Sequence, residues 1–194
     1  ANPSMDSVNS PQASSGQVDE YAKELAAMAE IYVNEAFASC GREHASIIGV
    51  PKLLPHYAGF RLAKEVEVLT NLVSNPKRPL LAIIGGAKLD TKIPVISSLA
   101  KVADNIIIGG KLLTEIMSGS PIMGMSKVKL LQLSPDGKDC TLESIDNCSL
   151  LIAHSATIVW NGPLGAVEDV PYQVGTRRIA ELVTASTAYK VVGG

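Results

Sequence analysis

Four short apolar runs, each followed by glycine, constrain the fold of this chain more than any other feature of its sequence. They are Leu80–Ile84 before Gly85-Gly86, Ile106–Ile108 before Gly109-Gly110, Thr157–Trp160 before Asn161-Gly162, and Tyr189–Val192 before Gly193-Gly194. Segments with helical spacing lie between most of them, at residues 91–101, 111–117 and 173–184. Strands that alternate with helices predict a parallel sheet with right-handed crossovers.

The first of these runs leads into two lysines. Lys88 and Lys92 follow the glycine pair, and a helix that buries Ile93, Ile96 and Leu99–Ala100 is expected after them. Glycine turns, helix N-termini and ammonium groups all favour a bound phosphate. The pattern is neither a Walker A loop nor a dinucleotide-binding glycine motif. A tight strand-to-helix turn with two solvated lysines therefore remains the alternative at this point.

The positions of the glycines strengthen the phosphate hypothesis. Ligands of open parallel sheets bind outside the carboxyl ends of the strands. All four glycine sites fall at such ends, so we expect them to converge on one edge of the sheet. Four converging turns favour a ligand site more strongly than a single turn does.

The composition is that of an ordinary globular protein with an aliphatic core. Of the 194 residues, 46% are hydrophobic, 19% are charged and only 4% are aromatic. A net charge of −2 gives no reason to expect nucleic acid or an anionic membrane as a partner. No apolar run approaches membrane-spanning length, and no secretory signal stands at the N-terminus.

The cysteines and histidines show no metal-ligand spacing, so no metal site is expected. An odd number of cysteines suits a reducing compartment, and the cytoplasm is the expected location. The residues in question are Cys40, Cys140, Cys148, His44, His56 and His154.

The segment before Leu80 is expected to belong to a different domain. Residues 1–17 are rich in Ser, Asn, Pro and Gly and predict a mobile tail or linker, or else an extended surface segment. A helix is expected from Val18, with Asp19 and Glu20 in its first turn. Its buried face is predicted to comprise Tyr21, Leu25, Met28 and Ala29. A strand is expected from Ile31 toward Phe37.

A polar loop and a long helix follow. Arg42 and His44 lie in the loop, where they meet an anionic ligand or are simply solvated. Val50–Pro55 is expected at the surface. Phe60–Leu72 predicts a helix with an apolar stripe at Leu62, Val66, Leu69 and Leu72–Val73, stopped by the prolines after it. The domain boundary is expected near residues 70–78.

The span from 118 to 148 interrupts the alternation of strands and helices. Val128–Leu133 is a predicted strand, and Ser134–Lys138 is a turn suited to a hairpin. Cys140–Leu142 is then the expected return strand. No catalytic constellation is expected in this span.

Several segments, in the same order along the chain, closely resemble motifs of phosphoglycerate kinases. They are Tyr32–Phe37 with Arg42, His44-Ala-Ser46, Arg78-Pro79 leading into Gly85-Gly-Ala-Lys88 with Lys92, Ile108-Gly-Gly110, and Val159–Gly165 with Glu168. The resemblance covers most of residues 20–194. It implies a two-domain α/β kinase with a Rossmann-like, doubly wound nucleotide domain and part of a second α/β domain.

The resemblance also implies domain limits and roles for residues. Residues 18–74 would be the end of the N-terminal substrate domain with the interdomain helix, and 75–194 a nucleotide-binding domain that is incomplete at its C-terminus. Arg42 and His44 would bind the glycerate substrate, and Arg42 and Lys88 would be catalytic. The nucleotide would be held by Gly86, Ala87, Lys88, Lys92, Gly110, Asn161, Gly162 and Glu168, the last on the ribose hydroxyls.

The implied reaction is phosphoryl transfer between 1,3-bisphosphoglycerate and ADP, giving 3-phosphoglycerate and ATP. Mg²⁺ would arrive with the nucleotide, with no metal site on the protein itself. The partners would be small molecules, not nucleic acid or membrane. A monomer is implied, and a plastid or a glycosome is as compatible with the motifs as the cytoplasm.

The chain also departs from the family pattern. Gly41 stands where histidine is usual, Lys111 where a third glycine is usual, and the stretch 118–150 is short. The first strands of the family, with most of the glycerate site, and a later glycine-rich helix start are not in this sequence. Three readings follow: part of a full kinase, a proteolytic or alternative product, or an inactive kinase-like subunit of a larger assembly. We expect no kinase turnover from these 194 residues alone.

Overall fold

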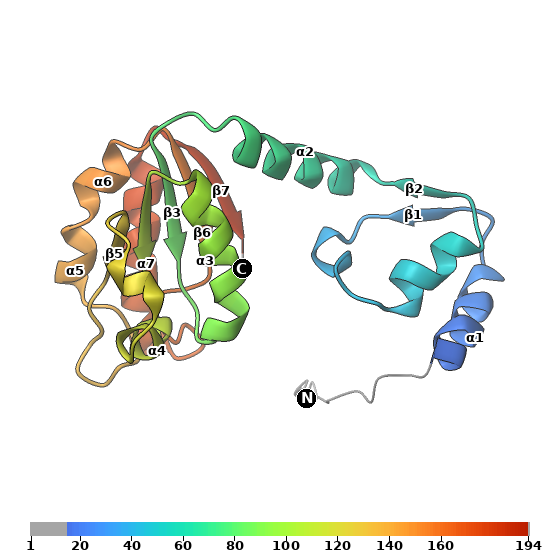
Figure 1. The fold of residues 1–194 in the computed structure, drawn as a ribbon, viewed down its shortest axis with the longest axis horizontal. Helices are drawn as coiled ribbons and strands as arrows, with labels where there is room; N and C mark the ends of the chain where they lie inside the picture. The colour runs from blue at the N-terminus through green and yellow to red at the C-terminus, as the bar shows by residue number, and fades with distance from the viewer. Residues whose placement is uncertain (1–14, 194) are drawn as a thin grey trace. The chain divides into compact units, whose positions relative to one another are not determined.

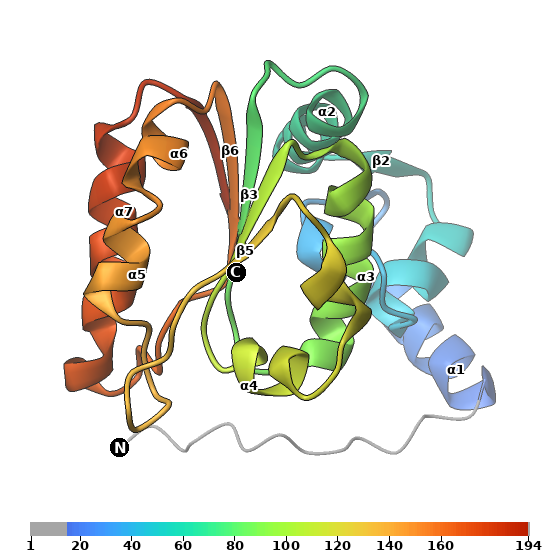
Figure 2. The same cartoon turned by 60° about the vertical axis from the view of Figure 1, so that its left-hand side comes forward.

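The computed structural model describes residues 15–193, which divide into two compact units with the boundary between Ser74 and Asn75 (Figures 1 and 2). The predicted tail at residues 1–14 lies outside the described residues. Helix α1 begins at Ser15, so residues 15–17 are helical and do not belong to a tail. Each unit is described by itself below.

The second unit is built on a five-stranded sheet in which every pair of neighbours is parallel. Its strand order is β5 (Val128–Leu130), β4 (Asn105–Ile108), β3 (Leu80–Ile84), β6 (Thr157–Asn161) and β7 (Tyr189–Gly193). The predicted α/β fold with a Rossmann-like parallel sheet is confirmed. All strands point the same way, so the glycine turns after β3, β4 and β6 lie at one edge.

Helices cover both faces of this sheet (Figure 2). Helices α3 (Leu89–Val102) and α4 (Leu112–Met117) lie on one face. Helices α5 (Leu142–Asp146) and α6 (Ser149–Ala153) pack on α7 (Val174–Ala185) on the other. Two short 3₁₀ helices, Pro121–Gly124 and Val170–Gln173, complete the connections. This two-sided cover explains why the central strands consist of unbroken apolar runs.

The core of the second unit is aliphatic, as predicted. All five residues of β3 are fully buried, as are Ile106–Ile108 of β4. Helix α3 contributes Ile96, which is also fully buried. Ile93 was predicted to be buried on the same face of this helix, but the residue is 40% exposed near the start of the helix.

The predicted hairpin between Val128 and Leu142 is only partly formed. Strand β5 ends at Leu130 and pairs in parallel with β4. Beyond it, an isolated antiparallel bridge joins Leu133 to Cys140, flanked by hydrogen bonds from the Ser134 N–H to the Asp139 carbonyl and from the Thr141 N–H to the Gln132 carbonyl, both at 2.8 Å. The chain therefore reverses at this turn as predicted, but the pairing does not extend into two strands. The side chains of Asp139 and Cys140 accept hydrogen bonds from the Gly175 and Gly110 N–H groups of other elements of the unit.

Within residues 15–74, the first unit contains a two-stranded parallel sheet and four helical segments before its long helix. Strands β1 (Tyr32–Asn34) and β2 (His56–Ala58) pair in register. Helix α1 (Ser15–Ala26) is followed along the chain by short helical turns at Phe37–Ser39, Ala45–Gly49 and Val50–Lys52. Helix α2 spans Phe60–Ser74 and ends before the prolines, as predicted.

The packing of α1 differs from the prediction. Within residues 19–26, whose burial is described, Ala22 is buried in a cluster with Ala45 and Val50, and Leu25 packs against this cluster as predicted, while Tyr21 is 56% exposed. Met28 and Ala29 follow the end of the helix at Ala26. Because α1 starts earlier than predicted, Asp19 and Glu20 fall outside its first turn.

Three other expectations for the first unit also need correction. The strand after Ile31 stops at Asn34, and β2, which is exposed along its length, was not predicted. Val50 is buried, so the segment Val50–Pro55 does not lie wholly at the surface. On α2 the stripe is narrower than predicted, since Leu62 and Leu72 are buried but Val66 is not.

Candidate functional site

The turns after β3, β4 and β6 interlock through backbone hydrogen bonds. The Gly85 N–H donates to the Asn161 carbonyl at 2.9 Å, and the Gly86 N–H donates to the Pro163 carbonyl at 2.8 Å. The Gly86 carbonyl in turn accepts from the Leu112 N–H at the start of α4, at 3.2 Å. The predicted convergence of the glycine turns is therefore confirmed for these three strands. We call Gly85-Gly86, Gly109-Gly110 and Gly162 the glycine rim.

Backbone crowding explains why glycine occupies these positions. Gly86, Gly110 and Gly162 have φ angles of 119°, 76° and 85°, which L side chains rarely adopt. A Cβ on Gly110 would lie 2.9 Å from the Gly86 carbonyl oxygen, and one on Gly162 would lie 2.6 Å from the Gly85 carbonyl oxygen. The three turns approach each other closely only because side chains are absent.

The N–H groups of four glycines at this edge are already hydrogen-bonded within the protein. Gly85 and Gly86 donate within the rim, Gly162 donates to the Gly193 carbonyl at 3.2 Å, and Gly110 donates to the Cys140 sulfur at 3.2 Å. These amides serve packing between strands, so they are not donors for a ligand. Donors for an anion at this edge come instead from the first turn of α3 and from lysine side chains.

The two lysines flank the start of α3. Lys88 is its N-cap, with extended backbone angles, and its side chain is exposed. Lys92 lies one turn later, and its Nζ donates a hydrogen bond to Asn161 Oδ1 at the end of β6. Its Cε lies 3.3 Å from where a Cβ of Gly86 would stand. Lys92 therefore folds back over the glycine rim and joins α3 to β6.

The loop after β6 carries the remaining predicted nucleotide residue. Glu168 is exposed on the turn that follows Gly165. Among residues 15–193, no recorded hydrogen bond or ion pair joins Glu168 to Lys92 or Asn161. Ala87 is exposed between the rim and α3. The structure thus brings Gly86, Lys92, Gly110, Asn161 and Gly162 into contact with one another, and leaves Ala87 and Glu168 at the surface.

The residues predicted to meet the glycerate substrate lie in the first unit. Arg42 and His44 are both exposed, and the Arg42 N–H donates to the Ser39 carbonyl at 3.0 Å. His44 is the N-cap of the helical turn Ala45–Gly49. A Cβ on Gly41, where the family usually has histidine, would have no heavy atom within 4 Å, so a larger side chain fits there.

The structure adds one segment that the sequence did not reveal. Lys138–Cys140, inside the span where no functional residues were predicted, touches both the β4 turn and the loop after β6. The Cys140 sulfur accepts from the Gly110 N–H, and burial raises the pKa of its thiol to about 11. The Lys138 carbonyl accepts from the Ala166 N–H at 2.9 Å. A single turn motif in the sequence gives no signal of such contacts, because they join residues distant along the chain.

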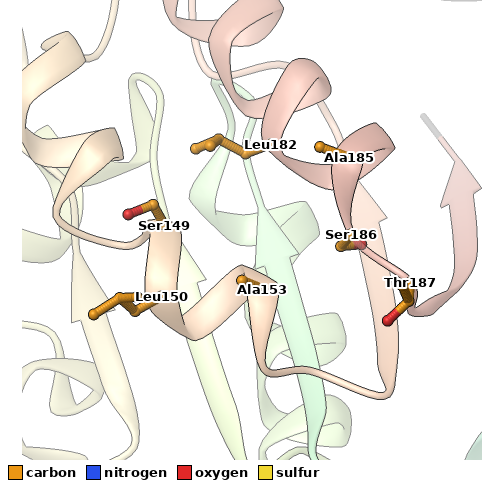
Figure 3. A pocket seen from close by; sticks show the side chains of 7 residues that line it. All are labelled: Ser149, Leu150, Ala153, Leu182, Ala185, Ser186 and Thr187. Atoms are coloured by element: carbon orange, nitrogen blue, oxygen red, sulfur yellow. The ribbon is translucent and has the colours of Figure 1, made fainter.

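A groove lies away from the glycine rim, against two of the helices. This groove of about 300 Å³ is lined by Ser149, Leu150, Ala153, Leu182, Ala185, Ser186 and Thr187 (Figure 3). It lies between α6 and the C-terminal end of α7. Because these ends lead into the amino ends of β6 and β7, the groove is at the opposite edge of the sheet from the rim. Its lining is largely apolar and offers no charged group to a nucleotide.

Two further features bear on the kind of site. Within the described part of the chain, no group of three or more His, Cys, Asp or Glu side chains is arranged to hold a metal ion. None of the helices among the described residues is both long enough and apolar enough to cross a membrane.

A parallel sheet covered by helices on both faces, with crowded glycine turns and two lysines at its carboxyl edge, defines an α/β protein of the doubly wound class, in which ligands bind at that edge. The comparisons with known proteins are more specific. The family model for phosphoglycerate kinase matches residues 6–128 and 123–194. This chain therefore belongs to the phosphoglycerate kinase family.

Individual relatives agree with this assignment. The chain is 33% identical to a phosphoglycerate kinase of Leptospira biflexa, over 91% of this chain and 56% of that one. It is 33% identical to one of Solibacter usitatus, over 90% of this chain and 55% of that one. The chain thus spans about half the length of these relatives. Nothing in these comparisons favours the alternative of an inactive structural subunit.

Solved structures give the same result. Phosphoglycerate kinase from Coxiella burnetii matches with a TM-score of 0.69 and 30% identity, covering 91% of this chain and 57% of that one. The enzyme from Pyrococcus horikoshii matches with a TM-score of 0.79 at 20% identity, over 91% of this chain and 58% of that one, which supports the fold.

Proposed function

We propose that this chain binds ADP or ATP at the glycine rim and serves phosphoryl transfer between 1,3-bisphosphoglycerate and ADP. The observation that carries the proposal is the hydrogen bond from Lys92 to Asn161 across Gly86. It unites two family motifs at one edge of the sheet: the motif that runs from β3 into α3, and the motif at the end of β6. The unit 75–194 is proposed as the nucleotide domain and the unit 18–74 as part of the substrate domain.

The proposed roles follow from charge and position. In the forward reaction the bond between phosphorus and the carboxyl oxygen of 1,3-bisphosphoglycerate breaks, and a terminal oxygen of the ADP β-phosphate bonds to that phosphorus. The transition state of such a transfer needs charge neutralisation and alignment more than covalent chemistry. Lys88 at the N-cap of α3 and Lys92 one turn later lie beside the start of the helix, and their ammonium groups neutralise the phosphate chain. The amides of the first turn of α3, which begins at Leu89 directly after Ala87 and Lys88, add positive potential.

The other residues would position the two substrates. Asn161 holds the ammonium group of Lys92 against the rim, Gly162 and Gly110 leave room for the nucleotide, and Glu168 accepts hydrogen bonds from the ribose hydroxyls. Arg42 and His44 bind the phosphate of the glycerate substrate. Mg²⁺ enters on the phosphates of the nucleotide and neutralises part of their charge.

The proposed setting is a reducing compartment such as the cytoplasm. Cys140 and Cys148 are buried free thiols, and Cys40 is an exposed one, which suits a protein that forms no disulfides. A small-molecule substrate and a monomeric state are proposed by analogy with the family.

Nucleotide binding is tested by calorimetric titration of the 194-residue chain with MgADP. The chain is expected to bind, and Lys88→Met combined with Lys92→Met is expected to weaken binding at least tenfold. Lys101→Met is the matched control, because Lys101 is an exposed lysine in the last turn of the same helix. Unchanged affinity in the double variant, or no binding by the parent chain at millimolar MgADP, contradicts the proposal.

Turnover is a separate hypothesis. Because much of the family's glycerate site is not in this sequence, the 194-residue chain alone is expected to bind nucleotide without consuming it. The measurement is ADP release from MgATP with and without 3-phosphoglycerate. Release that depends on 3-phosphoglycerate contradicts this hypothesis.

A further inference from the structure

Asp139 has a buried carboxylate that takes no part in the proposed binding of nucleotide or glycerate substrate. Only 6% of the residue is exposed. Its Oδ1 accepts a hydrogen bond from the Cys140 N–H and its Oδ2 accepts one from the Gly175 N–H, both at 2.8 Å. No ion pair of Asp139 is recorded among residues 15–193. A charge buried this deeply is costly unless backbone donors satisfy it, so the site is built around the carboxylate.

The carboxylate caps helix α7 from outside the helix. Gly175 is the second residue of α7, and the first turn of this helix has no acidic residue of its own. The N-cap residue Gln173 makes no capping bond, and its side-chain NH₂ group donates to the Val167 carbonyl at 2.8 Å. Asp139 therefore supplies the negative charge that a helix N-terminus favours.

Two glycines make the space for this contact. A Cβ on Gly175 would lie 2.5 Å from Asp139 Oδ1, and a Cβ on Gly165 would collide with the same oxygen and with the Tyr172 carbonyl. Gly165 belongs to the loop after β6, and Gly175 to α7. The carboxylate thus lies between the loop that carries Glu168 and the helix that follows it.

Other bonds transmit this anchoring to the loop. The Leu164 N–H donates to Thr176 Oγ1 on α7 at 2.9 Å, and the Ala166 N–H donates to the Lys138 carbonyl, next to Asp139, at 2.9 Å. Lys138 also lies over the ring of Tyr172, with Nζ 4.9 Å from the centroid. These contacts therefore connect the loop after β6 to α7 and to the segment beside Asp139.

We propose that Asp139 is a positioning residue of the nucleotide site: its buried carboxylate fixes the start of α7 and thereby the loop Gly162–Asp169. This inference rests on the proposed nucleotide site. The segment Lys138–Cys140, which lies outside the recognised motifs, would then hold Glu168 at a set distance from the glycine rim. The carboxylate itself does not touch the nucleotide.

The test compares Asp139→Asn with Thr157→Val. Asparagine keeps the volume but presents an NH₂ group to one of two N–H donors, so one of the two bonds is lost. Thr157 is 2% exposed, and its hydroxyl donates to the Lys77 carbonyl at 2.7 Å at the amino end of β6. Thr157→Val thus removes one buried hydrogen bond at the opposite edge of the same sheet.

Both variants are titrated with MgADP and with the magnesium complex of 2′,3′-dideoxy-ADP, at a temperature where circular dichroism shows them folded. Asp139→Asn is expected to raise the Kd for MgADP at least fivefold and to lower the preference for ADP over its dideoxy analogue at least threefold. Thr157→Val is expected to change neither by more than twofold. An equal effect of the two variants, or no effect of Asp139→Asn, overturns the proposal.

Hydrogen exchange separates this proposal from the proposed function. Without nucleotide, Asp139→Asn is expected to speed amide exchange in residues 162–170 at least tenfold, and Thr157→Val is not. If the parent chain binds no MgADP, the proposed function fails, and unchanged exchange in Asp139→Asn still overturns the role of Asp139. If Asp139→Asn does not fold, Thr176→Val, which leaves the carboxylate in place, must weaken MgADP binding at least threefold, and unchanged affinity overturns the proposal.

Discussion

The ammonium group of Lys92 on α3 is hydrogen-bonded to Oδ1 of Asn161, the last residue of β6. The two residues lie far apart along the chain and come together because β3 and β6 are neighbours in the sheet. Lys92 is only partly buried, so its ammonium group lies near the rim and remains partly accessible to solvent. This bond is the most direct link between the helix and the strand end that the proposed site requires.

Lys92→Met and Asn161→Ala are predicted to weaken MgADP binding by less in combination than the sum of their separate effects. Each change removes the same hydrogen bond, so the second has less left to disrupt. Each single variant is expected to lose about 0.5–1.5 kcal/mol of stability. A double-mutant cycle measured by titration and urea unfolding checks this. Strict additivity of the binding losses would show that the two side chains act independently.

Gly110→Ala is predicted to destabilise the chain more than Gly137→Ala. Both glycines have similar positive φ angles, 76° and 71°. A Cβ on Gly137 meets nothing within 4 Å, whereas one on Gly110 meets the Gly86 backbone. Gly137→Ala should cost about 1–2 kcal/mol from backbone strain alone. Gly110→Ala should cost a further amount of about 1–3 kcal/mol from crowding. Urea unfolding measures both, and equal losses would contradict the crowding of the rim.

Asp104 is predicted to make folding sensitive to acid. The Leu80 N–H bonded to its Oδ2 at 2.7 Å, together with Arg78 at 2.5 Å from Oδ1, lowers the pKa of this carboxyl. The unfolded state therefore binds its proton first as the pH falls. The contribution of Asp104 to stability is present above about pH 4 and is lost progressively below it.

Asp104→Asn is accordingly expected to flatten the acid side of a plot of unfolding free energy against pH. Arg78→Met should flatten it only in part, because the bond from Leu80 remains and is the larger cause of the lowered pKa. Urea unfolding between about pH 5 and pH 2 provides the measurement. An Asp104→Asn slope equal to that of the parent chain contradicts the assignment.

The three cysteines are predicted to differ in reactivity. Cys40 is exposed, whereas Cys140 and Cys148 are buried, and burial raises the pKa of both buried thiols. Only thiolates react rapidly. At pH 8, iodoacetamide should therefore label one thiol of the folded chain quickly and all three after denaturation, as read by intact mass. Cys40→Ser should abolish the fast step, and rapid labelling of a second thiol contradicts this prediction.

The strands with unbroken apolar runs that end in glycine could be predicted from the sequence. The helices between them could also be predicted, with ends that differ from the structure by one or two residues. Leu80–Ile84 is buried on both faces, and such a strand leaves a clear mark in the sequence. The return strand predicted at Cys140 is reduced to a single bridge with Leu133. The bonds that tie the side chains of Asp139 and Cys140 to α7 and to the β4 turn were not predictable, because those elements are remote in sequence. The short strand His56–Ala58 is exposed and carries no alternation to detect.

The site was predictable in outline but not in its chemistry. The sequence located Gly86, Gly110 and Asn161 at one edge of the sheet, and the structure agrees. It could not show that the amides of Gly86 and Gly110 are already bonded within the protein, since that depends on Pro163 and Cys140. Nor could it distinguish Asp139 from a solvated turn residue, because its burial arises only when Gly165 and Gly175 pack around it.

The two neighbours of β3 in the sheet are synthesised at different times, and this affects how the chain folds during its synthesis. One edge of β3 pairs with β4, which follows after a single helix, but its other edge pairs with β6, which the ribosome produces much later. Until Thr157–Asn161 emerge, the nascent chain holds a wholly apolar strand with one row of unpaired N–H and C=O groups. Open strand edges of this kind are templates for association between chains. Synthesis that stalls between β4 and β6 is therefore the stage at which this protein is most prone to aggregate.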